Sequence, residues 1–311
     1  MSNISIIILT YNKLDYTKKC LEALRKNTPK EFLKDIIIID NKSSDGTQEY
    51  LRKIDWINFV ENKINTGFAK GCNQGAKLAK GDILLFLNND TEVQKGWLES
   101  LLKVLEKKDV AVVGSKLLFP DGLIQHAGIV IANDRIPRPI YYRESPDRPY
   151  VNKQREFKAV TAACLAVKRD IFQEVGGFDE TYFNSMEDVD LCLKIFNKGY
   201  KIIYCPESVI IHHESVSPGR HDYDIKNNKL FLKKWSNEEP DEQKYYKEDG
   251  RSWLYRKDRE LVNKYYNIFY DQKPLILQIP GFCYRFFHKA VTGISLLLRL
   301  DFQELKKRVA K

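Results

Sequence analysis

The sequence predicts an α/β protein built on a doubly wound, mostly parallel sheet. Through the first 115 residues, runs of apolar and largely β-branched residues alternate with segments of helical periodicity. These runs lack the alternating polar residues of a half-exposed strand, so helices are expected to cover both faces of the sheet. Hydrophobic residues make up 43% of the chain, which suffices for a core and excludes wholesale disorder.

The first-half elements follow from this alternation in order. Residues 4–9 predict a strand, and the helix after it has small or apolar residues at helical spacing: Leu14, Thr17, Leu21 and Leu24. A short helix through Leu51 is expected to be capped by Ser44 or Asp45. Further strands are expected over 35–40, 57–60, 82–87 and 110–114, and further helices over 67–79 and 96–107.

The second half begins with turns and short strands, from 116 to about 160, including a Pro/Arg-rich loop over 133–149 that is longer than an ordinary connection. Regular structure is then expected to return, and the chain after 220 is helical, charged and aromatic. A small-residue strand over 159–170 is expected to lead to a short helix that ends at Gly176-Gly177. An acidic helix over 186–198 and strands over 201–204 and 208–212 are expected to follow.

Charge and cysteine content narrow the class of protein. The formal charge of +9 fits an anionic ligand, an anionic membrane surface or nucleic acid. Basic residues are dispersed among acidic ones and no nucleic-acid module is recognisable, which disfavours a nucleic-acid partner. The six cysteines are scattered with no Cys-x-x-Cys pair, so reduced thiols are expected. No signal peptide or run of roughly 20 apolar residues occurs, so we expect a cytoplasmic, non-spanning protein.

Polar residues follow three predicted strands, where ligands bind in open α/β sheets. They are Thr10-Tyr11-Asn12, Asp40-Asn41 and Asn88-Asn89-Asp90. Asp40 can accept a hydrogen bond from a nucleotide base, and Thr10 and Asn12 can contact the base or ribose. Asp90 is a hard oxygen donor that suits Mg²⁺ or Mn²⁺ bound to phosphates. For Asn12 and Asn41, turn formation is an equally good explanation.

A glycine-bearing segment, "NTGFAKGCNQG" (65–75), leads into a predicted helix between these strand ends. It offers free backbone amides and a positive helix end to an anion, with Asn65, Gly67 and Asn73 as candidate donor-binding residues. The segment is not a Rossmann G-x-G-x-x-G, and no Walker sequence occurs. NAD binding and ATP hydrolysis are therefore not leading hypotheses.

The stretch from Tyr182 to His213 is the most informative part of the chain. It places Glu187-Asp188 and Asp190 at the start of an amphipathic helix, and the strand that follows ends in His212-His213. Each acid alone can be explained as a complement to the helix dipole. Together with Asp90, the acids and the histidine pair predict a metal and a general base in one cleft.

Several segments in order resemble family 2 inverting glycosyltransferases of the GT-A fold, and in particular the rhamnosyltransferase-like branch. The resemblance covers about residues 3 to 235. The segments are "SIIILTYNKLDYTKKCLEAL", "IIIIDNKSSDGT", "NTGFAKGCNQGAKLAKGDILLFLNNDTEV", "GSKLLFPDGLIQHAG" and "EDVDLCLKIFNKGYKIIYCPESVIIHHES". The resemblance implies a nucleotide-sugar-binding half over 1–115 and a metal and acceptor half of the same domain over 116–235. Beyond it, the sequence itself predicts a helical C-terminal extension over 236–311.

The resemblance also implies roles for single residues. Asp40 matches the base-contacting acid, and Asn88-Asn89-Asp90 stands where the family has Asp-x-Asp, with Asn88 replacing the first aspartate and Asp90 keeping the metal position. Glu187-Asp188 matches the family's "ED" pair, with Asp188 as catalytic base. His212 stands where relatives place a histidine beside the metal or diphosphate.

Three further residues are candidates for the acceptor side: His126, Asp190 and His213. The small-residue segment "VTAACL" is expected to form the floor under the acceptor, although ordinary core packing explains it equally well. The extension mixes aromatic with basic residues. One expectation is that the extension lies on an anionic membrane surface, the inner face of the cytoplasmic membrane. The other is that it packs on the catalytic core or on the second subunit of a homodimer.

The leading hypothesis is a metal-assisted, inverting transfer from a UDP- or dTDP-sugar, dTDP-rhamnose included, to a hydroxyl of a growing glycan or lipid-linked acceptor. Two alternatives are a sugar nucleotidylyltransferase and a basic nucleic-acid-binding protein. The first is disfavoured because the N-terminal loop lacks a glycine-rich, Arg-containing triphosphate turn. A catalytically idle scaffold is disfavoured by the presence of Asp90, Asp188 and His212.

Overall fold

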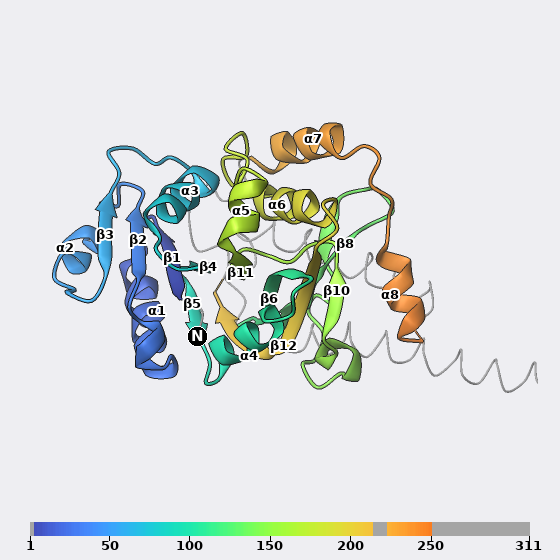
Figure 1. Cartoon of the computed structure of the whole chain (residues 1–311), viewed down its shortest axis with the longest axis horizontal. Helices are drawn as coiled ribbons and strands as arrows, with labels where there is room; N and C mark the ends of the chain where they lie inside the picture. The colour runs from blue at the N-terminus through green and yellow to red at the C-terminus, as the bar shows by residue number, and fades with distance from the viewer. Residues whose placement is uncertain (1–2, 214–222, 251–311) are drawn as a thin grey trace, which may run out of the picture. The chain divides into compact units, whose positions relative to one another are not determined.

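The computed structural model describes residues 3–213 and 223–250. The chain divides into two compact units, residues 1–242 and 243–311. The first unit contains the whole sheet, and the fold below is that of this unit (Figure 1). Of the second unit, only its first residues are described, and α8 (Glu242–Glu248) lies at that boundary.

A ten-stranded sheet forms the centre of the first unit, in the order β10-β12-β6-β11-β4-β1-β2-β3, with β5 paired to β12 and β7 to β6. Its strands are β1 (Ile4–Thr10), β2 (Ile36–Asp40), β3 (Asn58–Glu61), β4 (Ile83–Asn88), β5 (Thr91–Val93), β6 (Val110–Leu118), β7 (Ile124–His126), β10 (Arg155–Phe157), β11 (Cys164–Lys168) and β12 (Lys201–His212). A separate two-stranded sheet pairs β8 (Ile129–Ile131) with β9 (Pro137–Pro139).

The predicted parallel half is confirmed. Strands β4, β1, β2 and β3 pair in parallel, and Thr10 of β1 lies opposite Asp40 of β2. Strand β11 then runs antiparallel between β4 and β6, while β6 and β12 pair in parallel. The sheet is therefore parallel where a nucleotide is expected and mixed on the acceptor side.

Helices cover both faces of the sheet, as the unbroken apolar runs predicted. They are α1 (Leu14–Asn27), α2 (Thr47–Leu51), α3 (Phe68–Leu78), α4 (Trp97–Leu105), α5 (Arg169–Glu174), α6 (Glu187–Phe196) and α7 (Asp224–Lys234), with 3-10 turns over Lys30–Phe32 and Pro149–Asn152. Ile6 and Ile8 of β1 pack in the core with α1 and α4. On the opposite face α3 lies very close, because a Cβ on Gly71 would come 2.3 Å from Leu9 Cδ1.

Five details differ from the sequence predictions. The strands expected over 201–204 and 208–212 are one strand, β12, with an irregularity between Cys205 and Val209. Strand β11 begins at Cys164 rather than near 159. The loop over 133–149 contains β9, and the short strand β5 was not expected. The N-cap of α2 is Gly46, whereas Asp45 accepts a hydrogen bond from the Thr47 amide.

Residues 251–311, which hold most of the predicted C-terminal extension, lie outside the described residues. Its proposed membrane or subunit contacts, and the three-part division of the chain, stay predictions. Among the helices of the described residues, none combines the length and apolar character needed to cross a membrane. The five described cysteines are buried and unpaired.

Candidate active site

Asp40 lies at the end of β2 and is completely buried, with 0% of its surface exposed. Four protein donors fill its carboxylate. Thr10 Oγ1 donates at 2.9 Å, the Ser43 amide at 2.8 Å and Gln48 Nε2 at 2.6 Å, and the Ser43 hydroxyl is the fourth. An ionised carboxylate has about four acceptor positions. A nucleotide base can therefore reach Asp40 only by replacing one of these donors.

The residues after β1 differ in their accessibility. Tyr11 is 38% exposed. Asn12 has a positive φ of 56°, and it holds the loop after β2: its amide donates to Ser43 Oγ at 2.6 Å and its Oδ1 accepts from the Ser44 amide at 2.8 Å. Of Tyr11 and Asn12, Tyr11 is thus the one that is open to a ligand. Asn12 holds the loop after β2, in addition to the contact with the base or ribose predicted for it.

The glycine-bearing segment is held by internal hydrogen bonds. The Gly67 amide donates to Asn65 Oδ1 at 2.9 Å, and the Phe68 amide donates to the Phe183 carbonyl at 2.8 Å. The expectation that these amides are free for an anion is therefore wrong for both. Gly67 has a φ of 80°, and a Cβ there would come 2.5 Å from the Phe183 carbonyl oxygen. Glycine is required by the conformation and by this close approach.

Asn73 of α3 holds a different loop. Its Nδ2 donates to the Phe178 carbonyl at 2.9 Å and to Glu180 Oε1 at 3.1 Å, while its Oδ1 accepts from the Phe178 amide at 3.0 Å. These bonds fasten the start of the segment that leads to α6. A contact between Asn73 and a nucleotide sugar stays a prediction.

Asp90 and His212 converge at the ends of β4 and β12. Asp90 is buried, and its Oδ1 lies 3.1 Å from His212 Nε2. Asn88 Nδ2 lies 3.4 Å from the same nitrogen, whereas Asn89 Nδ2 donates to Thr17 Oγ1 of α1 at 3.0 Å. Asn88 and Asp90 thus face His212, and Asn89 faces away from it toward α1.

Gln125 fixes the orientation of the His212 ring. Its Oε1 lies 2.6 Å from His212 Nδ1, so Nδ1 carries the proton and donates it. The other nitrogen, Nε2, faces Asp90. Burial of the Asp90 carboxyl opposes ionisation, but the charge and hydrogen bond of His212 outweigh it and hold its pKa below the usual value. This role of Gln125 was not predicted from the sequence, in which Gln125 only precedes His126 in a short strand.

This pair fits a divalent cation. A carboxylate oxygen suits Mg²⁺ or Mn²⁺, and a histidine whose other nitrogen is hydrogen-bonded is the usual arrangement of a metal-binding imidazole. Within the described residues, no group of three or more His, Cys, Asp and Glu side chains could hold a metal. Two protein ligands leave the remaining positions for water or phosphate oxygens, as expected for Mg²⁺ bound together with a diphosphate.

Asp188 lies in the first turn of α6, directly after the buried Glu187. Its Oδ2 accepts a hydrogen bond from the Ala162 amide at 3.0 Å, and its Oδ1 accepts one from the Val189 amide at 2.8 Å. The next residue, Ala163, accepts a hydrogen bond from the Asn88 amide at 3.0 Å. Two successive residues before β11 therefore connect the predicted base with the strand end that leads to Asp90.

The three acceptor-side candidates all have protein partners. His126 is 1% exposed, its Nδ1 donates to the Ser115 carbonyl at 2.9 Å and its Nε2 accepts from the Thr161 amide at 3.3 Å. Burial lowers the pKa of His126 to about 4, so this ring is neutral at pH 7. His213 Nε2 lies 2.7 Å from Glu92 Oε1. A direct contact of His126 or His213 with the acceptor stays a prediction.

Asp190 of α6 is buried, and its carboxylate contacts side chains from the end of α7 and from α6 itself. Lys234 Nζ lies 2.7 Å from its Oδ1, Trp235 Nε1 donates to the same oxygen at 2.9 Å, and Lys194 Nζ lies 3.5 Å from its Oδ2. The carboxylate thus connects two helices. An acceptor contact of Asp190 likewise stays a prediction.

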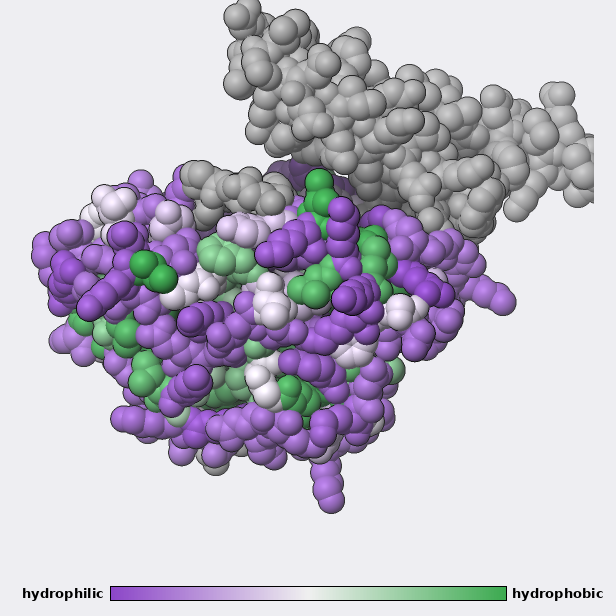
Figure 2. Space-filling view, turned by 90° about the horizontal axis from the view of Figure 1, so that it is seen from above, coloured by the Kyte–Doolittle hydropathy of each residue, from purple (hydrophilic) through white to green (hydrophobic). Residues whose placement is uncertain are grey.

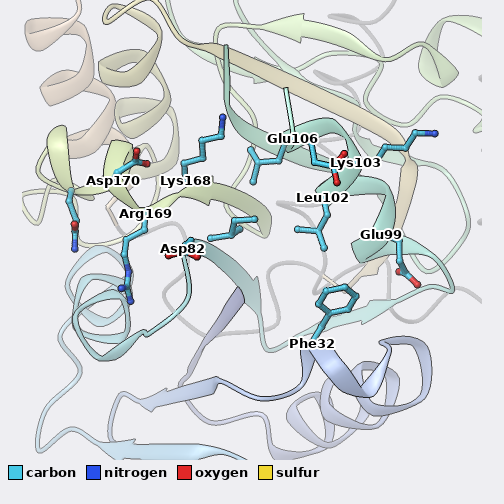
Figure 3. A pocket seen from close by; sticks show the side chains of 12 residues that line it. Phe32, Asp82, Glu99, Leu102, Lys103, Glu106, Lys168, Arg169 and Asp170 are labelled. Atoms are coloured by element: carbon cyan, nitrogen blue, oxygen red, sulfur yellow. The ribbon is translucent and has the colours of Figure 1, made fainter. Parts of the chain in front are cut away.

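The surface hollow in Figure 3 is separate from these residues. It has a volume of about 730 Å³ and is lined by residues at the start of β4, such as Asp82 and Ile83, together with side chains from α4 and α5. Asp90 follows the opposite end of β4. The hollow has a mixed acidic and basic lining, and none of the residues predicted to bind the donor, the metal or the acceptor is among its lining residues, so nothing places the chemistry there.

The mixed sheet, with the antiparallel strand β11 between β4 and β6, defines the class of fold: an α/β protein of the GT-A type. The chain matches the model of Glycosyl transferase family 2 over residues 5–176, more than half of its length, and it belongs to that family.

Two proteins of known name are similar in sequence. The O-antigen biosynthesis protein RfbC of Myxococcus xanthus is 31% identical over 69% of this chain, which spans only 17% of the length of RfbC. The N-acetylglucosaminyl-diphospho-decaprenol L-rhamnosyltransferase of Mycobacterium tuberculosis is 26% identical over 69% of this chain and 77% of that protein. These relatives agree with the predicted rhamnosyltransferase-like branch.

A solved structure of GalNAc-T7 with UDP, GalNAc and Mn²⁺ has a TM-score of 0.61 to this chain. It is 19% identical and covers 76% of this chain and 48% of the other. At that identity the likeness establishes the GT-A fold alone.

Proposed function

We propose that this chain transfers a sugar from a UDP- or dTDP-sugar to a hydroxyl of a growing glycan or lipid-linked acceptor, by single displacement with inversion. The observation that supports this most directly is the linkage through Ala162 and Ala163. Their backbones bind Asp188 and Asn88 respectively, so a carboxylate base is held beside the strand end that carries Asp90. No Ser or Cys nucleophile is required for such a reaction.

In this proposal Asp188 is the general base. A sugar hydroxyl is a poor nucleophile, and a positioned carboxylate can accept its proton as the oxygen attacks the anomeric carbon. The amides of Ala162 and Val189 occupy one position on each Asp188 oxygen. Each oxygen keeps a second acceptor position for the substrate proton.

Asp90 and His212 are the residues that would hold Mg²⁺ or Mn²⁺. A bound cation would neutralise the charge that develops on the departing nucleoside diphosphate. The structure of GalNAc-T7 with UDP and Mn²⁺ supports this by analogy of fold. The chain's own contribution is a buried carboxylate aligned with an imidazole that Gln125 orients.

Asp40 and Tyr11 are proposed to bind the nucleotide base. The full hydrogen bonding of Asp40 means that base binding replaces a protein donor. Gln48 is the donor that can move, because its side chain is half-exposed whereas Thr10 and Ser43 are buried. An N–H group of uracil or thymine would then take the place of Gln48 Nε2.

A ligand panel tests the proposal. Thermal unfolding of the full chain is measured with UDP, dTDP, GDP and their sugars, each with and without Mn²⁺. Ligand at about 100 times its Kd stabilises a protein by about 2.7 kcal/mol, so a true donor produces a clear rise in Tm. A rise with UDP or dTDP that depends on Mn²⁺, and release of nucleoside diphosphate from the same sugar, are expected. Absence of both for every nucleotide sugar would contradict the proposal.

A further inference from the structure

Helix α7 contacts the chain directly before α6, the helix that carries Asp188. The connecting side chain is Asn227, which is 0% exposed. Its Nδ2 donates to the carbonyl of Asn184 at 2.6 Å and to that of Ser185 at 3.0 Å. One buried amide group therefore binds two successive carbonyls just before the start of α6. In Figure 1, α7 and α6 are drawn as neighbouring helices.

The turn that Asn227 holds has an unfavourable backbone conformation. Ser185 and Met186 have φ values of 82° and 75°, so two successive residues with side chains adopt the left-handed region. This region is unfavourable for a residue other than glycine, because its Cβ lies too close to the following carbonyl oxygen. Such a conformation persists only where the surrounding structure holds it. The two hydrogen bonds from Asn227 supply part of that restraint.

The other end of α7 is fixed to α6 beyond Asp188. Lys234 Nζ lies 2.7 Å from Asp190 Oδ1, and Trp235 Nε1 donates to the same oxygen at 2.9 Å. Lys234 Nζ also lies 2.7 Å from Asp179 Oδ2. Asp190 is completely buried, and the ammonium groups of Lys234 on α7 and Lys194 on α6 compensate the negative charge of its carboxylate. Helix α7 thus holds the chain on both sides of Asp188.

The surface of the molecule that Figure 2 shows, seen from above Figure 1, is mostly polar. Figure 2 shows hydrophilic residues over much of its surface, with smaller hydrophobic areas between them. The inward-facing contacts of α7 and of Trp235 after it are the hydrogen bonds and ion pairs given above, beside the packing of Phe231, which is 1% exposed. Such contacts fix a position more narrowly than apolar packing does, because they require defined distances and angles.

We propose that α7 is the element that positions the catalytic base, with Asn227 and Lys234 as positioning residues that act through Asp188. Asn227 holds the left-handed turn in front of the base, and Lys234 with Trp235 holds Asp190 behind it. The inference rests on the proposed role of Asp188. It extends that role by stating what keeps the carboxylate directed at the reacting hydroxyl.

Asn227→Ala in the full chain tests the inference, and Asn228→Ala is its matched control. Asn228 is the next residue of the same helix, is half-buried, and has no side-chain hydrogen bond to any described residue. Amide hydrogen exchange over residues 184–190 should become at least about tenfold faster in Asn227→Ala, because the turn opens locally. Exchange in Asn228→Ala should match the wild type.

Turnover provides the second measurement, with the UDP- or dTDP-sugar that the wild type accepts. Displacement of a reacting group by about 1 Å can cost on the order of 10²-fold in rate. Asn227→Ala should lower kcat by about this factor and leave KM for the donor within about threefold, since uniform binding is unchanged. Lys234→Ala should behave similarly, while Lys233→Ala, which alters an exposed neighbour on α7, should not.

Rescue by glycine separates positioning from general stability. Glycine adopts a positive φ at little cost. Ser185→Gly with Met186→Gly, added to Asn227→Ala, should therefore recover at least about tenfold of the lost kcat, as the turn no longer needs the restraint. If Asn227 merely stabilised α7, glycine at these two positions would recover nothing.

The outcomes are distinguishable. Equal exchange rates in Asn227→Ala and Asn228→Ala would overturn the inference, as would a parallel loss of donor affinity and kcat without rescue. If the wild type turns over no nucleotide sugar, the proposed function fails. The exchange comparison then decides by itself whether Asn227 holds the turn before Asp188.

Discussion

The His212 ring lies beside the Asp90 carboxylate, with Nε2 and Oδ1 3.1 Å apart, because a three-residue strand joins their two segments. Strand β5 starts directly after Asp90 and pairs antiparallel with the end of β12, so that Thr91 lies opposite His212. The His213 amide also donates to the Asp90 carbonyl at 3.0 Å. The backbone thus sets the separation of the two side chains, and a cation or a proton between them is the natural complement.

Asp90→Ala should abolish the Mn²⁺ dependence of UDP or dTDP binding and leave the protein folded. The carboxylate is the only hard anionic ligand in the Asp90–His212 pair, and one imidazole alone holds Mn²⁺ weakly. Calorimetric titration with and without Mn²⁺ measures the effect. Asp82→Ala is the control, since Asp82 precedes the opposite end of the same strand. Unchanged Mn²⁺-dependent affinity in Asp90→Ala would refute the metal assignment.

Gln125→Leu should weaken Mn²⁺ binding about 10- to 100-fold, the usual effect of removing the partner that orients a metal-binding histidine. Leucine removes the acceptor of His212 Nδ1, so the ring loses its fixed tautomer and orientation. Gln125→Glu keeps an acceptor oxygen at the same place and should retain most of the affinity. Titration of each variant with Mn²⁺ in the presence of saturating UDP or dTDP compares them. Equal Mn²⁺ affinities for the two variants would show that Gln125 does not orient the metal-binding histidine.

Much of the fold could be predicted from the sequence, because the first half obeys a simple rule. Its β1 and β2 runs are apolar on both faces, and helices cover both faces. The acceptor side follows no such rule. Strand β5 has three residues, and β11 lies antiparallel between two strands distant in sequence, so neither periodicity nor spacing could place them.

The site could be predicted only in part, for a similar reason. Charged residues at strand ends, such as Asp90 and His212, stand out in a sequence. The residues that orient them do not: Gln125 and Asn227 are uncharged, and their importance comes from tertiary contacts across the fold. The glycine-bearing segment shows the converse. Gly67 looked like part of an anion site, yet its amide is already occupied by Asn65.

Asp179 should make the stability of the protein dependent on pH in the acidic range. Burial opposes its ionisation, but hydrogen bonds from Lys234 and Thr181 lower its pKa from 3.8 to about 2. Because the folded-state pKa is depressed, the stabilisation is complete above about pH 4 and is lost as the pH falls toward 2. Asp179→Asn should therefore lower the urea midpoint at pH 6 and lower it less at pH 3. A difference of the same size at both values would contradict the assignment.

The segment beyond residue 250 should bind anionic vesicles if it is a membrane-peripheral element. Its sequence alternates aromatic and aliphatic residues with Lys and Arg. Surface attraction is screened over about 8–10 Å at physiological ionic strength, so binding should fall as salt rises. Co-sedimentation with anionic and with neutral vesicles measures this, with removal of residues 274–311 as the comparison. Salt-independent binding, or a truncated chain that changes its oligomeric state instead, would favour a packing role.

Asp188→Asn should leave donor binding nearly intact and remove most of the transfer activity. The two side chains are almost isosteric, and the Asn Oδ1 can still accept from the Ala162 amide, while the bond from the Val189 amide is lost. The ability to accept a proton is also lost, and a general base contributes typically about 10²–10⁴-fold. Donor affinity by calorimetry and nucleoside diphosphate release under the same conditions separate binding from chemistry. Glu187→Gln is the necessary comparison, since its carboxylate is adjacent and buried. If Asp188→Asn turned over donor like the wild type while Glu187→Gln did not, the base would be Glu187, and the hydrogen bonds of Ala162 and Val189 would hold a residue that serves only to orient the helix.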